Sequence, residues 1–93
     1  MRFERLSFFI ASIQPVAGGW RLEGEPGYDR QYWARPGDRF DRALNEDDGD
    51  DRVIDLVVVD LNESSVVLTG RGGDLLRPND IVSGERPVIR SAG

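Results

Sequence analysis

A six-residue pattern occurs twice in this chain, as Arg35-Pro36-Gly37-Asp38-Arg39-Phe40 and, 42 residues later, as Arg77-Pro78-Asn79-Asp80-Ile81-Val82. Each copy predicts a turn that leads into a strand. Proline fixes the first turn position, glycine or asparagine accepts a left-handed backbone, and the aspartate can hydrogen-bond nearby backbone before the apolar residues begin. Two copies indicate a β-fold built from two similar halves around a pseudo-twofold axis.

The length of 93 residues predicts a single domain, 1–93. A chain of this size buries only about 60–65% of its unfolded surface and cannot divide that core. Hydrophobic residues make up 39% and charged residues 31%, which is the range of ordinary globular proteins. We expect the core to span about residues 3–85, with 86–93 as a C-terminal edge strand or tail.

The chain reads as an all-β protein. Apolar residues nowhere recur with helical spacing over about three turns, and short apolar runs alternate with turn residues. Strands are expected at 8–13, 18–23, 39–44, 53–61 and 65–69, and a last one runs into Val82. Six or seven short strands predict a small closed or nearly closed β-barrel, because closure removes exposed strand edges.

Two strands carry clear facial patterns. Trp20 and Leu22 alternate with charged residues, so we place both in the core. In 53–61, apolar residues occupy both faces, which predicts a central strand that is covered on both sides.

The composition excludes much enzyme chemistry. There is no cysteine and no histidine, which removes disulfides, thiolate nucleophiles, the usual zinc sites and the customary general base. We therefore expect a non-enzymatic protein without catalytic residues, cofactor or metal. Asp55 interrupts the apolar strand 53–61, and we expect it to be an inward polar residue bonded to an arginine or to backbone.

The acidic segment 45–51 predicts a solvated hairpin tip, because its like charges repel one another. It does not fit a calcium loop. With Gly49 as the sixth position, Leu44 would be first and Asp55 twelfth, so the opening aspartate and the closing glutamate are both missing.

The net charge of −5 and the isoelectric point near 4.6 oppose a general affinity for nucleic acid or anionic membranes. The N-terminal apolar run is short and is preceded by Glu4, which does not suit a signal peptide. No run approaches the roughly 20 apolar residues that span a bilayer. A cytoplasmic location without a membrane partner is expected.

The order of motifs resembles the second-domain β-barrel of translational GTPases of the elongation-factor-Tu type. In that family, a Gly-x-Val-x-x-Gly strand precedes a Gly-Asp-x-Val turn, and a later Arg-Gly-Asp-Val-Leu-like turn closes the barrel. The matching stretches are Gly19-Trp20-Arg21-Leu22-Glu23-Gly24, Pro36-Gly37-Asp38-Arg39-Phe40, Leu68-Thr69-Gly70 and Leu76-Arg77-Pro78-Asn79-Asp80-Ile81-Val82.

The resemblance covers about residues 3–85 and implies a freestanding barrel that acts as a contact module. In the parent factors this barrel packs against neighbouring domains and contacts RNA or the ribosome. The segment 28–34 is longer than the family's connection, and Asn79 stands where glycine is usual. Without lysine the chain cannot supply a Gly-x-x-x-x-Gly-Lys-Ser/Thr loop, so GTP hydrolysis is not implied.

One aromatic and arginine-rich segment is the candidate contact surface, because such residues are enriched at binding hot spots. The candidate partner-binding residues are Tyr28, Arg30, Tyr32, Trp33 and Arg35. The alternative is that Trp33 and one tyrosine plug the barrel end while the arginines pair with carboxylates. That alternative is favoured, since aromatic clusters are more often packing than contact.

The sequence thus predicts a module that binds another protein, as a monomer or a weak homodimer. The alternative function is an RNA- or ribosome-binding accessory of translation, which the resemblance favours and the negative charge disfavours.

Overall fold

The computed structural model describes residues 2–27, 34–62 and 64–88. Six strands and one short 3-10 turn make up this part of the chain. In chain order they are β1 (Arg2–Val16), β2 (Gly19–Pro26), β3 (Arg39–Asn45), β4 (Asp51–Leu61), β5 (Ser65–Arg71), η2 (Gly73–Leu75) and β6 (Asp80–Val88).

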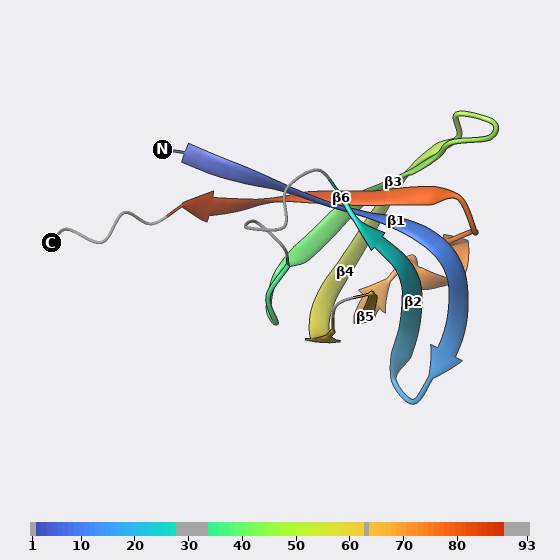
Figure 1. Ribbon diagram of the computed structural model, residues 1–93, viewed down its shortest axis with the longest axis horizontal. Coiled ribbons are helices and arrows are strands. Elements are labelled where there is room, and N and C mark those ends of the chain that lie inside the picture. Colours follow the sequence, from blue (N-terminus) through green and yellow to red (C-terminus); the bar gives the residue numbers. More distant parts are fainter. Residues whose placement is uncertain (1, 28–33, 63, 89–93) are drawn as a thin grey trace, which may run out of the picture.

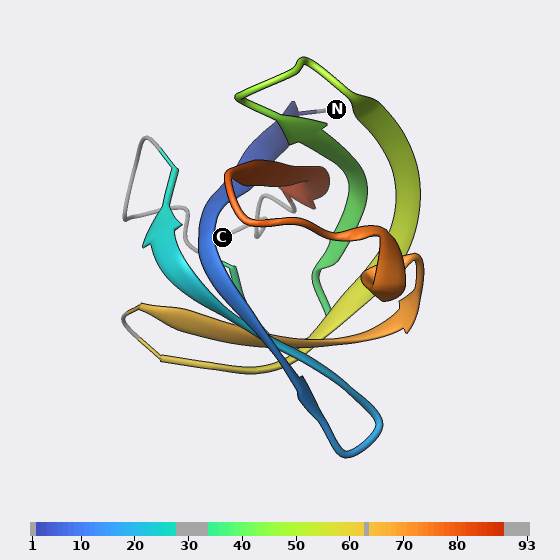
Figure 2. The same cartoon turned by 90° about the vertical axis from the view of Figure 1, so that its right-hand side faces the viewer.

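The six strands form one closed antiparallel barrel, which confirms the predicted fold class. Around the ring the order is β1-β2-β5-β4-β3-β6, and β6 pairs with β1 to complete the wall. Figure 2 shows the strands curving round into this wall, and in Figure 1 the start of β1 and the end of β6 run side by side. No helix in the described ranges has the length and hydrophobicity needed to span a bilayer.

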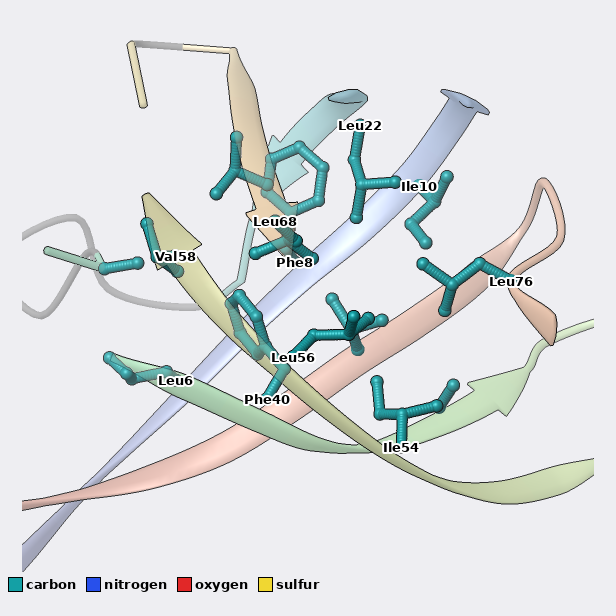
Figure 3. Close-up of a cluster of buried hydrophobic side chains, with 14 residues drawn as sticks. Leu6, Phe8, Ile10, Leu22, Phe40, Ile54, Leu56, Val58, Leu68 and Leu76 are labelled. Carbon is teal, nitrogen blue, oxygen red and sulfur yellow. The ribbon is translucent and has the colours of Figure 1, made fainter. Parts of the chain in front are cut away.

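The core fills the inside of the barrel with apolar side chains from every strand and from two loop positions (Figure 3). Its buried members are Leu6, Phe8, Ile10, Leu22, Ala34, Phe40, Ala43, Ile54, Leu56, Val58, Val66, Leu68, Leu76 and Val82. Leu22 is fully buried, as predicted, and Trp20 is partly buried and packs against this cluster.

The two copies of the repeated motif adopt the same turn. In the first, the backbone N–H of Arg35 donates to Oδ2 of Asp38 at 2.7 Å, and the N–H of Asp38 donates to the Arg35 carbonyl at 3.0 Å. In the second, Arg77 and Asp80 make the same two bonds at 2.6 and 3.1 Å. The aspartate in each copy therefore closes its own turn.

Each turn is also anchored on the other half of the barrel. The N–H of Gly37 donates to the carbonyl of Val58 in β4, and the N–H of Asn79 donates to the carbonyl of Ile10 in β1, both at 2.8 Å. The φ angles of Gly37 and Asn79 are 94° and 69°, in the left-handed region that glycine and asparagine accept. The pairing register shifts just after each accepting residue, so the two halves share a bulge as well as a turn.

The ring order has the expected pseudo-twofold symmetry. Exchanging β1 with β4, β2 with β5 and β3 with β6 reproduces the order of strands read in the opposite direction. A twofold axis perpendicular to the barrel axis reverses the order of strands around the ring in this way. The axis passes between β2 and β5 and between β3 and β6, and the two halves also meet along β3–β4 and along β1–β6.

The prediction that strand 53–61 is covered on both sides is wrong. Ile54, Leu56 and Val58 are buried, but Val53 and Val59 on the other face are 78% and 49% exposed. A small barrel has a single wall, so only its inner face meets the core. The apolar residues on the outer face of β4 lie at the protein surface.

Candidate functional site

The predicted contact segment falls mainly outside the described residues. Four of its five members lie in 28–33, which the structure does not describe: Tyr28, Arg30, Tyr32 and Trp33. Arg35 is exposed and opens the first turn. The contact surface at this segment therefore stays a prediction.

A groove of about 630 Å³ lies on the outer side of the wall, over β6 and its neighbours β1 and β3. Figure 1 labels these three strands. Its lining combines apolar, hydroxyl and charged side chains. We call it the outer groove, and it is lined by Arg5, Ser7, Phe9, Gly27, Arg42, Leu44, Glu46, Asp51, Ile81 and Ser83.

Three apolar side chains form a row across this groove. Ile81 of β6 lies in register with Phe9 of β1 on one side and with Leu44 of β3 on the other. The residues next to them in the chain are buried. Because successive side chains of a strand point to opposite faces, the side chains of the row point out of the barrel. Leu44 is 44% exposed, and Val53 of β4 lies diagonally beside it. Phe9 and Ile81 are half-buried, and together with the exposed Leu44 and Val53 they form an apolar surface of the kind that is typical of a binding site.

A polar row follows the apolar row. Ser7, Ser83 and Arg42 lie in register across the same three strands. Nε of Arg42 is 3.1 Å from Oδ1 of Asp51, so this arginine is held by an ion pair at the groove wall. At the apolar row, β1, β6 and β3 each pair with a strand on both sides. A molecule bound there would be held by side chains, since the strand backbone is already paired.

The β3–β4 hairpin lies at one end of the groove, which Glu46 and Asp51 line, and it carries five carboxylates between residues 46 and 51. Three of them pair with arginines: Asp48 with Arg77 at 2.9 Å, Asp50 with Arg52 at 3.2 Å, and Asp51 with Arg42 at 3.1 Å. Glu46 and Asp47 have no arginine within ion-pair distance in the described part of the chain. The predicted hairpin tip is confirmed as exposed, and it carries negative charge that its arginines do not balance.

A buried polar cluster holds this hairpin on the second turn. Asp80 is fully buried and pairs with Arg52, while its Oδ1 accepts a hydrogen bond from Nδ2 of Asn45 at 3.0 Å. The Oδ1 atom of Asn45 accepts the backbone N–H of Asp47 at 2.9 Å. Asn79 adds a bond from its Nδ2 to Oδ2 of Asp47 at 2.9 Å. The acidic loop is thus fixed in place at the groove end.

Hydrogen bonds favour the ionised form of Asp48 in the hairpin. The pKa of Asp48 is lowered from its ordinary 3.8, first by the backbone N–H of Asp50 and then by the side chain of Arg77. The same contact raises the pKa of Arg77, chiefly through its hydrogen bond to Asp48. Both groups therefore stay charged throughout the neutral range.

Asp55 lies on the outer face, so its predicted inward orientation is wrong. Its Oδ1 is 2.7 Å from Nη1 of Arg39, and both side chains are more than half exposed. The expected arginine partner is present, but the pair is at the surface because Asp55 alternates with the buried Ile54 and Leu56. Among the residues that the structure describes, no group of three or more acidic side chains could hold a metal ion.

The outer groove was not predicted from the sequence, although a signal for it exists. Phe8-Phe9 and Ile81-Val82 are adjacent apolar pairs within strands. Such a pair places one side chain on each face. In a barrel with a single wall, one member of each pair must lie outside.

Comparison with known proteins gives no assignment for this chain. No family model matches it, and no significant match is found among curated proteins or among solved structures.

Proposed function

We propose that this barrel is a non-enzymatic module that binds another protein through the outer groove. The observation that carries the proposal is the row of Phe9, Ile81 and Leu44, which spans three neighbouring strands on the surface. Interfaces are organised around such apolar centres with a polar rim. Here the serines, the arginines and the hairpin carboxylates supply the rim.

The closed six-stranded barrel is compatible with the second-domain barrel of translational GTPases. As part of the proposal, the chain acts as a barrel of that kind, whose role is contact. The absence of cysteine and histidine from the sequence supports a role without catalysis.

Affinity capture of the tagged protein from its native lysate, with and without RNase, tests this function. The test variant is Leu44→Glu, which places a charge in the apolar row at a side chain that is 44% exposed. Its matched control is Val59→Glu on β4, which is 49% exposed and does not line the groove. Because both positions are partly open to solvent, we expect both variants to fold.

We expect the wild type and Val59→Glu to retain a stoichiometric protein partner after RNase treatment, and Leu44→Glu to lose it. Equal capture by both variants would remove the groove from the function. Loss of the captured material from the wild type on RNase treatment would instead support the RNA-binding alternative.

A further inference from the structure

We propose that the outer groove receives an amphipathic α-helix of its partner, with basic side chains of that helix over the β3–β4 hairpin. This inference rests on the proposed function and adds the chemistry of the bound segment. It is carried by the size of the groove, the pairing of its strands and the unbalanced charge at one end.

The apolar row has the length of two turns of an α-helix. From β1 to β3 there are two inter-strand spacings, which amount to about 10 Å. Two turns of an α-helix rise by about 11 Å. A helix that crosses the groove can place residues spaced three and four apart on Phe9, Ile81 and Leu44.

An added strand does not fit at the same place. Recognition by strand addition requires a free sheet edge whose backbone N–H and C=O groups are unpaired. At the apolar row, β1 pairs with β2 and β6, and β3 pairs with β6 and β4. Side-chain contact is what this surface offers, and an amphipathic helix supplies it.

The charges at the hairpin end select a basic partner. Glu46 lines the groove without an arginine within ion-pair distance in the described ranges, and the carboxylate of Asp47 next to it accepts a hydrogen bond from the neutral amide of Asn79. Glu25 lies in register with Phe9 at the opposite end of the row and is also exposed. Within the described ranges it makes no ion pair. A lysine or arginine flanking the helix anchors would find a carboxylate at either end.

Two synthetic helical peptides serve as probes. Both carry leucines at positions i, i+3, i+4 and i+7; one has lysines on the flanks, and its twin has glutamates at the same places. Their affinities for the full chain are measured by fluorescence anisotropy. We expect the basic peptide to bind about tenfold more tightly than its twin, because opposite charges at an interface favour one partner and disfavour the other.

Reversing the charge of Glu46 tests whether the basic peptide binds at the hairpin end of the groove. Glu46→Lys should weaken the basic peptide about fivefold, since one charge contact near a surface is worth about 1 kcal/mol. The control is Glu23→Lys on β2, an exposed glutamate outside the groove that gives the same change in net charge. We expect Glu23→Lys to leave the affinity nearly unchanged, and Leu44→Glu to abolish binding.

Equal affinities of the two peptides, no binding of either, or equal effects of Glu46→Lys and Glu23→Lys would overturn this inference. None of these results touches the proposed function, which fails if protein capture does not depend on Leu44 or is lost on RNase treatment. If RNA rather than a helix occupies the groove, the basic peptide does not bind and capture is lost on RNase treatment.

Discussion

At the scale of single residues, Asp80 shows how a turn motif becomes a structural anchor. Its carboxylate is fully buried and accepts bonds from the backbone of Arg77 and the side chains of Asn45 and Arg52. Its counterpart Asp38 accepts the equivalent backbone bond and pairs with Arg86 at 2.8 Å, at a position that is slightly more open. The carboxylate of Asp80 thus accepts bonds from more groups than the carboxylate of Asp38.

We therefore expect Asp80→Ala to destabilise the fold by about 3–5 kcal/mol, because it leaves Arg52 without its buried partner. Asp38→Ala should cost about 1–3 kcal/mol. Urea unfolding of both variants measures the difference. If Asp80→Ala does not fold, Asp80→Asn retains an acceptor for the backbone bond and should unfold between Asp80→Ala and the wild type. Equal losses at the two positions would contradict this account.

At the scale of elements, the sequence predicted turns better than strand ends. The turn motif encodes its own geometry through a left-handed position and an aspartate, so both copies could be located from residues alone. By contrast, the apolar pattern placed the first strand at 8–13 and ran the last strand only into Val82. In the structure β1 begins at Arg2 and β6 continues to Val88, and the two strands pair with each other up to these ends. The outer groove was missed because it depends on register between three strands that are distant in the chain.

The β3–β4 hairpin should respond to acid through Asp48. Its pKa is lower in the folded protein than the ordinary 3.8, so ionised Asp48 stabilises the fold above that pH. The stabilisation is lost as the pH falls through the lowered folded value. We expect Asp48→Asn to be less stable than the wild type at neutral pH and equally stable once the pH is well below 3.8. Urea unfolding across this range measures the difference, and a gap that does not change with pH would contradict the role of Asp48.

At the scale of the whole molecule, two of the strand pairs that join the halves are the seams β2–β5 and β3–β6, and each has a glycine where strands approach closely. A Cβ on Gly19 would overlap the carbonyl oxygen of Leu68 at the β2–β5 seam. A Cβ on Gly84 would overlap the carbonyl oxygen of Arg39 beside the β3–β6 seam. Both obstructing atoms belong to the backbone, so relief requires the strands themselves to separate.

The last prediction concerns this closure. Gly84→Ala should destabilise the barrel by about 1–3 kcal/mol through overpacking. Because β6 pairs with both β1 and β3, the strain should also lower amide hydrogen-exchange protection in all three strands. The control is Ser83→Ala, which changes the neighbouring outward side chain and should leave protection unchanged. Loss of protection confined to the residues next to Gly84, or stability equal to that of Ser83→Ala, would show that close approach at this seam does not hold the two halves together.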